Sequence, residues 1–318
     1  MANQEQLALL QQGVNLWNEW HRTHPMQNDL SGADLSALDL RRIYLNDADL
    51  SGVNLNKTDL KDADLRKAIL FEANLIATNL YKANLSEAYL SEADLSEANL
   101  CEAFLSEAIL SEAILVEADL SRANLRKAVL WLAHLREANL SEADLTGADL
   151  SEANLRDALL NLANLTGANL HQTDLTGASL RWTNLTRANF SQANLSEANL
   201  NLANLKDTNL TQANLSKAIL SLAELCGADL SGANLAGVNL IGADLSGANL
   251  KGANLTEADL IGANLADVNL DGADLTGANL NGANLQRADL THTVIERADL
   301  READITTATL PFGWQPAR

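Results

Sequence analysis

The chain has 318 residues, with 42 acidic and 22 basic side chains and a formal net charge of −20. An acidic chain of this kind has no broad basic face for phosphates, so direct nucleic-acid binding is not expected. Apolar residues never form a run of about 18, so no membrane-spanning helix is expected. The N-terminus lacks the basic and apolar regions of a secretory signal, and we expect a cytoplasmic protein.

Residues 1–25 are predicted to form an N-terminal helical cap. Apolar side chains recur at helical spacing through this segment, and Asn3 followed by Gln6 resembles a capping box. Pro25 is expected to end the single helix by about His24.

Two interpretations of this helix compete. In the first, Trp17 and Trp20 cover the first coil of the following structure, whose open end would expose backbone edges. In the second, the helix is an amphipathic segment for a membrane or a partner. The scarcity of Lys and Arg argues against a membrane surface.

Residues 26–310 are dominated by a period of five, in which each unit reads like Ser91-Glu92-Ala93-Asp94-Leu95. On a helix, successive leucines would be rotated by about 140°, so no apolar stripe would form. On one long strand, Ala98 would lie on the face opposite to Ala93. A β-turn centred on Ser96 and Glu97 removes this conflict and points every Ala and Leu inward.

The outward positions repeat every twenty residues, which indicates four short strands per coil. The runs Ala148-Asp149-Leu150 and Ala233-Asn234-Leu235 carry a motif that resembles the pentapeptide-repeat family over residues 31–310. The resemblance implies an all-β solenoid, a right-handed quadrilateral β-helix of about fourteen coils. The Trp17–Arg22 segment is similar to the Trp-rich header of some cyanobacterial members.

Turn chemistry divides the coils into two zones. Gly227 to Gly252 place glycine at the second turn position, where a type II turn needs positive φ. Earlier turns carry residues such as Lys67 and Glu92 there, so a type II turn is less expected for them. Three threonines replace alanine in the inner column, and their hydroxyls are expected to bond nearby backbone: Thr173, Thr183 and Thr208.

Residues 311–318 form a predicted C-terminal cap or tail. Phe312 and Trp314 are expected to fold over the last coil, and the alternative is a homodimer that joins two copies end to end through the same aromatics. Cys101 and Cys226 are roughly 30 Å apart by strand spacing, too far for a disulfide, so they are expected to be free thiols.

No sequence pattern indicates catalysis or the binding of a metal or cofactor. Histidines and cysteines lack metal-ligand spacing, there is no glycine-rich phosphate loop, and the carboxylates are spread by the repeat. We therefore expect no catalytic, cofactor-binding or metal-binding residues, and no enzyme.

Acidic side chains are dense between residues 71 and 160, which hold sixteen acidic and six basic residues. Like charges stacked on neighbouring strands destabilise a sheet, so stability does not explain them. The ordinary explanation is solubility. Some members of the family that the chain resembles mimic DNA and bind type II topoisomerases. This resemblance makes four glutamates a candidate acidic face: Glu92, Glu97, Glu112 and Glu117.

Two rows of outward apolar residues form the candidate partner surface. One replaces the usual Asp/Asn on four coils, at Ile69, Tyr89, Ile109 and Val129, and the other occupies turn positions, at Leu162, Trp182, Leu202 and Leu222. Stacked apolar groups could simply bury one another, but contiguous patches mark interaction sites. We expect a non-enzymatic scaffold or regulator that binds a protein partner; the alternative is an acidic DNA mimic that binds a DNA-handling enzyme.

Overall fold

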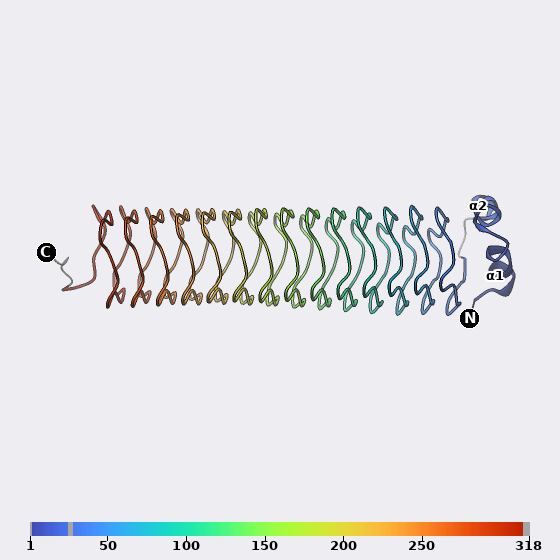
Figure 1. Ribbon diagram of the computed structural model, residues 1–318, viewed down its shortest axis with the longest axis horizontal. Helices are drawn as coiled ribbons and strands as arrows, with labels where there is room; N and C mark the ends of the chain where they lie inside the picture. The colour runs from blue at the N-terminus through green and yellow to red at the C-terminus, as the bar shows by residue number, and fades with distance from the viewer. Residues whose placement is uncertain (1, 25–27, 314–318) are drawn as a thin grey trace. The chain divides into compact units, whose positions relative to one another are not determined.

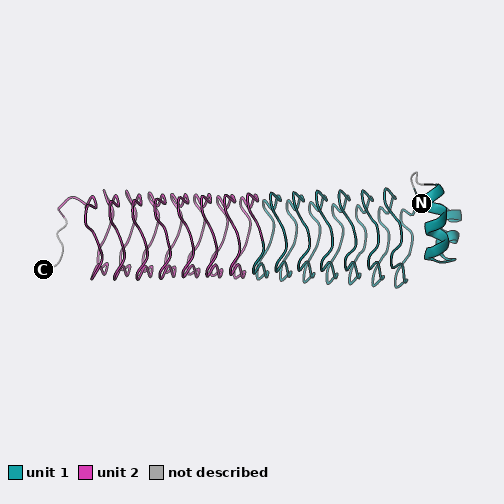
Figure 2. Cartoon of the chain, turned by 90° about the horizontal axis from the view of Figure 1, so that it is seen from above, with its two compact units in different colours: residues 1–163 teal, residues 164–318 magenta. Residues whose placement is uncertain are grey.

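The computed structural model describes residues 2–24 and 28–313. They fall into two compact units, residues 1–163 (unit 1) and 164–318 (unit 2), both built of stacked coils (Figures 1 and 2). Unit 1 also carries two helices, α1 (Gln4–Leu10) and α2 (Val14–Thr23), beside its first coils. Among the described residues, no helix is long and apolar enough to cross a membrane.

The prediction of one continuous N-terminal helix is wrong. Gly13 separates α1 from α2 with φ at 119°, a backbone conformation that glycine adopts without the steric cost a side chain brings. Asn3 is the N-cap of α1, and its side chain accepts hydrogen bonds from the N–H groups of Glu5 and Gln6. The Gln6 side chain accepts from the Asp29 N–H at 2.9 Å, and so ties α1 to the first coil.

Each coil has four sides, because within each unit the outward residue of a pentapeptide forms a parallel bridge with the residue twenty positions on. Ile69 pairs with Tyr89 in unit 1, and Asn234 pairs with Asn254 in unit 2. The strands are single bridge residues, which run from Asp29 to Leu159 in unit 1 and from Asn164 to Thr309 in unit 2. Inter-coil hydrogen bonds flank each bridge.

The Ala and Leu positions form the core, as the period predicts. The leucine column is buried from Leu30 to Leu290. Leu38 in the first coil is an exception, since it is 38% exposed although it holds an inner-column position. Buried threonines bond to backbone as expected: the Thr208 hydroxyl donates to the Leu185 carbonyl at 3.1 Å, and Thr58 donates to Leu35 at 2.7 Å.

The expected division of the turns into two zones is wrong. The second turn residue has positive φ in both: 57° at Lys67, 59° at Glu92 and 67° at Gly247. The reason is the inter-coil ladder. The N–H of this residue donates to the next coil, from Glu92 to the Ser111 carbonyl at 3.0 Å and from Gly247 to Ala266 at 2.9 Å. One backbone geometry therefore serves every turn, whichever residue occupies it.

The C-terminal end of unit 2 is open in the described residues. Leu300 and Ile305 are only half-buried, unlike the leucines before them. The prediction that Phe312 folds over the last coil is wrong, since its side chain is 108% exposed. Trp314 lies outside the described residues.

Candidate functional site

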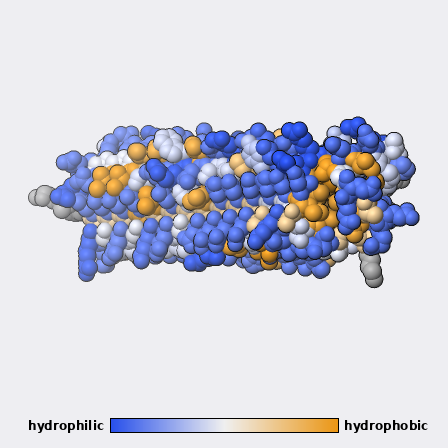
Figure 3. Space-filling view, turned by 45° about the vertical axis from the view of Figure 1, so that its right-hand side comes forward, coloured by the Kyte–Doolittle hydropathy of each residue, from blue (hydrophilic) through white to orange (hydrophobic). Residues whose placement is uncertain are grey.

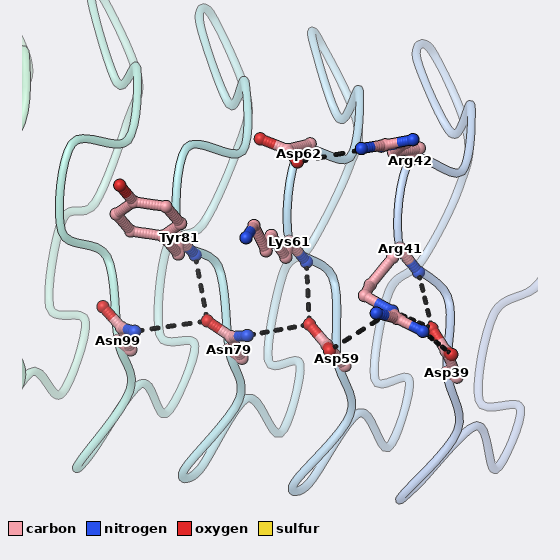
Figure 4. Close-up of polar contacts among 9 residues, drawn as sticks. All are labelled: Asp39, Arg41, Arg42, Asp59, Lys61, Asp62, Asn79, Tyr81 and Asn99. Atoms are coloured by element: carbon pink, nitrogen blue, oxygen red, sulfur yellow. Dashed lines mark hydrogen bonds and ion pairs between the residues drawn. The ribbon is translucent and has the colours of Figure 1, made fainter.

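The outward Asp and Asn side chains hold the turns and link the coils. In Figure 4, the Asp59 carboxylate accepts the Lys61 N–H at 3.1 Å, and the Asn79 amide donates to the same carboxylate at 2.8 Å. Asn79 accepts in turn from the Tyr81 N–H at 3.3 Å and from the Asn99 amide at 3.2 Å. The abundance of carboxylates and amides at this position is therefore explained by the fold.

The apolar column on one face of unit 1 interrupts this network. Ile69, Tyr89, Ile109 and Val129 follow one another in parallel bridges, as the twenty-residue period predicts. Unlike Asp and Asn, these side chains place no oxygen where it could accept from the turn N–H two residues on. The turn N–H groups that follow them have no protein acceptor among the described residues: Phe71, Ser91, Ser111 and Trp131.

Further exposed apolar side chains adjoin this column. Phe71 and Trp131 lie on the corner that follows the column, and Ile114 lies on the next face. Tyr89 is the most exposed member of the column itself, at 49%. Phe71 was not predicted from the sequence. An aromatic residue at a first turn position that is usually Ser was nevertheless a visible signal.

The two edges of the column differ in charge. On the preceding corner, Lys67 pairs with Glu87 at 3.6 Å and Lys127 pairs with Glu107 at 3.3 Å. On the following corner, Glu72, Glu92 and Glu112 stack with no basic group within ion-pair distance among the described residues. One edge is thus balanced and the other is acidic.

The predicted acidic face is assembled from two adjoining corners. Glu92 and Glu112 lie on one, and Glu97 and Glu117 lie on the next, across the face that holds Ile114. Ladder bonds from Glu92 to the Ser111 carbonyl and from Glu97 to the Val116 carbonyl place members of each row on successive coils. None of the four appears in an ion pair within the described part of unit 1.

The small basic cluster of unit 1 is neutralised by carboxylates. Arg122 pairs with Glu142 at 3.0 Å, Arg126 with Asp144 at 3.1 Å and Lys127 with Glu107. This surface presents paired charges and no free row of cations.

Unit 2 has its own apolar stripe along one corner. Trp182 is 56% exposed and Leu222 is 55% exposed, with Leu202 between them in the inter-coil ladder. Leu162, the first member of the predicted row, belongs to unit 1 and is 59% exposed there. Three exposed isoleucines on or beside the same corner of unit 2 extend the stripe and were missed in the sequence: Ile219, Ile241 and Ile261.

On the face seen in Figure 3, hydrophobic groups (orange) lie in patches on a largely hydrophilic surface. Among the described residues, no group of three or more His, Cys, Asp or Glu could hold a metal ion. Cys101 and Cys226 are free. Burial raises the pKa of the Cys226 thiol, which donates to Asp244 at 3.1 Å.

A pocket of about 590 Å³ lies where α2 meets the first coils, lined among others by Leu16, Asn18 and Arg42. Four of its charged residues pair with one another: the Arg41 guanidinium bonds Asp39 and holds the pKa of that carboxyl at about 2, and Arg42 lies 3.8 Å from Asp62. Lys61 also lines the pocket, and its ammonium lies 5.2 Å from the centre of the Tyr81 ring.

The comparison with protein-family models agrees with this architecture. The family model for pentapeptide repeats matches in eight copies, over residues 29–66, 68–106, 93–131, 124–161, 163–201, 203–240, 233–272 and 269–306. A comparison with curated protein sequences finds no match.

Several solved structures are similar. HetL, a pentapeptide repeat protein involved in heterocyst differentiation regulation from Nostoc sp. strain PCC 7120, is 31% identical over 93% of this chain and 96% of its own, with a TM-score of 0.24. Rfr23 from the cyanobacterium Cyanothece 51142 is 30% identical over 43% and 90%, with a TM-score of 0.28. QnrB1, a plasmid-mediated fluoroquinolone resistance protein, is 19% identical over 62% and 91%, with a TM-score of 0.31. Pentapeptide repeat proteins fold as right-handed quadrilateral β-helices, and the eight matched copies, which extend from residue 29 to residue 306, show that this chain belongs to the pentapeptide repeat family.

Proposed function

We propose that the protein is a non-enzymatic cytoplasmic scaffold or regulator that binds a protein partner through exposed apolar side chains of its coils. The observation that carries this proposal is the apolar column of unit 1. Each of its four residues gives up a turn hydrogen bond worth about 0.5–1.5 kcal/mol, whereas a stacked apolar pair returns only about 0.2–1 kcal/mol. The fold alone does not favour this column, and Tyr89 stays half exposed within it.

The stripe of unit 2 supports the same function. Trp182, Leu202 and Leu222 have φ between 58° and 60°, as the other turns do, but they put large apolar side chains where most coils carry a polar residue or glycine. Neighbouring coils place glycine at the same position, for example Gly242. Trp is enriched at binding hot spots, so a partner surface accounts for exposed apolar side chains that the turn does not require.

A photo-crosslinking experiment tests the proposal. Benzoylphenylalanine is placed at Tyr89 or at Trp182 in the cells that make the protein. Gln212, an exposed residue on the corner of unit 2 opposite Trp182, is the control position. We expect discrete products with a protein partner from the first two positions only. A product of twice the chain's mass would identify a second copy as the partner.

The specificity control restores the repeat motif. Ile109→Asn introduces the side chain that other columns carry, so the coil keeps its fold while the apolar surface is interrupted. The Tyr89 product should then weaken strongly. No discrete product from either position, or a Tyr89 product insensitive to Ile109→Asn, would contradict a partner surface here.

The unpaired glutamates favour a second candidate function, an acidic DNA mimic that binds a type II topoisomerase or another DNA-handling enzyme. Two rows with one carboxylate per coil place about one charge per 2.4 Å along the coils, against about one per 1.7 Å in duplex DNA. The test is inhibition of gyrase supercoiling at low salt. Lys substitutions at Glu92, Glu97, Glu112 and Glu117 should abolish it, and no inhibition by the unaltered protein at micromolar concentration would remove this function.

A further inference from the structure

We infer that the apolar column of unit 1 binds a basic amphipathic α-helix of a partner protein, with the Lys/Arg flank of that helix toward Glu92 and Glu112. This inference rests on the proposed function and specifies the chemistry of the partner. Three features of the surface carry it: the pitch of the column, the charge difference between its two edges, and the shape of the acidic corner.

The pitch of the column matches the apolar stripe of a helix. Neighbouring coils are about 4.8 Å apart, so the four side chains stand at about 0, 4.8, 9.6 and 14.4 Å. Helix positions i, i+3, i+7 and i+10 rise by about 0, 4.5, 10.5 and 15 Å. When a helix lies along the column, each of its four apolar residues is therefore within about 1 Å of the height of one column residue.

The ends of the column limit the contact. Asp49 precedes Ile69 in the same row of bridges, and Asp149 follows Val129. The apolar row is therefore bounded by a carboxylate at each end. A helix of about three turns spans it, which is a common length for a docking segment.

Charge sets the orientation of the bound helix around its axis. On the edge with Lys67, Glu87, Glu107 and Lys127, cations and anions already pair. On the other edge, Glu92 and Glu112 stack without a cation in the described part of the unit. A basic flank removes this like-charge repulsion, whereas an acidic flank adds to it.

The acidic corner has room for long basic side chains. Its first turn positions read Phe71, Ser91, Ser111 and Trp131, so two small residues lie between two exposed aromatic ones. A Lys or Arg stem can pass over Ser91 or Ser111 and bring its charge to the glutamate that follows each serine. The exposed rings of Phe71 and Trp131 at the two ends of this gap offer apolar surface on which the methylene stems can pack.

Two matched synthetic peptides test the inference. Both are 18-residue helices with the same leucine stripe, one with lysines along one flank and the other with glutamates there. Fluorescence anisotropy with the full chain measures each Kd at low and high salt. We expect the lysine peptide to bind at least about tenfold more tightly at low salt, and salt to narrow this difference.

Two pairs of substitutions that remove the same amount of charge show which edge of the column causes the lysine preference. Glu92→Gln with Glu112→Gln should remove most of the lysine preference, while Glu87→Gln with Glu107→Gln, on the balanced edge, should retain it. Tyr89→Asn with Ile109→Asn restores the motif and should weaken both peptides about tenfold or more with folding intact.

The outcomes separate this inference from the proposed function. Equal binding of both peptides, no binding of the lysine peptide, or equal effects of the two glutamine pairs would overturn the basic-helix partner. In each of these cases the crosslink from Tyr89 still reports whether the column is a partner surface. If that crosslink is absent while the lysine preference depends on Glu92 and Glu112, the peptide recognition stands and the proposed cellular function fails.

Discussion

The indole N–H of Trp17 donates to the backbone carbonyl of Tyr44 at 2.7 Å, and so fixes α2 against the first coils. Trp17 is fully buried. Asn18 adds two bonds beside it, from its amide to the Arg42 carbonyl and from the Tyr44 N–H to its oxygen, both at 2.9 Å. Trp17 and Asn18 therefore hold α2 against the first coils of unit 1.

Removal of Trp17 should loosen only the coils next to the helices. Trp17→Ala loses a buried ring and should cost about 3–5 kcal/mol locally, whereas Trp17→Phe loses mainly the bond to Tyr44 and should cost about 1 kcal/mol. Because each coil contacts mainly its neighbours, hydrogen exchange should accelerate in residues 28–70. Equal acceleration in residues 100–160 would show that unit 1 unfolds as a whole.

Outward positions should differ sharply in their contribution to stability. Asn79→Ala removes bonds to Asp59, Tyr81 and Asn99, and should cost about 1–3 kcal/mol. Tyr89→Asn should be neutral or stabilising, because it supplies an acceptor for the Ser91 N–H. Urea denaturation measures both, and similar losses for the two variants would disprove the turn-holding role of the outward amides.

Two glycines at equivalent turn positions should respond differently to alanine. Gly247 has φ 67° and an added Cβ meets nothing within 4 Å, so Gly247→Ala should cost only the backbone strain of about 1 kcal/mol. At Gly242 the added Cβ would lie 2.9 Å from Leu222 Cδ2, so the exposed Leu222 side chain must turn aside and Gly242→Ala should cost slightly more. In a double-mutant cycle by denaturant melts, Leu222→Ala should remove the excess; an unchanged excess would place its cause elsewhere.

The coils that hold Asp39 in unit 1 and Asp299 in unit 2 should lose stability only at the acidic end of a pH titration. Bonds from Arg41 and Arg301 lower the pKa of Asp39 and Asp299 from 3.8 to about 2. A carboxyl whose pKa is depressed on folding contributes stability above its unfolded pKa, and this is lost as pH falls from about 4 through 2. Carbon-detected NMR of the carboxyls should show Asp299 titrating near 2, and Arg301→Gln should raise that midpoint toward 3.8. An unshifted midpoint in the variant would exclude the arginine as the cause.

The five-residue period by itself determined which side chains face inward, because a strand of three residues and a turn of two permit one inward pair per unit. The same period placed Ile69, Tyr89, Ile109 and Val129 in one row, and Glu92 beside Glu112, since residues twenty apart stack in a four-sided coil. These relations need only spacing, and the structure shows them.

Only the tertiary structure decided the hydrogen-bond partners of the turns and the positions that depart from the five-residue pattern. The positive φ at Glu92 follows from a bond to the next coil, which no local preference of Glu predicts. The break at Gly13 and the exposure of Leu38 and Phe312 depend on what packs against each segment. The charge difference between the edges of the apolar column likewise depends on which side chains reach a partner one coil away. Lys67 and Lys127 pair with glutamates of neighbouring coils, whereas Glu92 and Glu112 stack on each other.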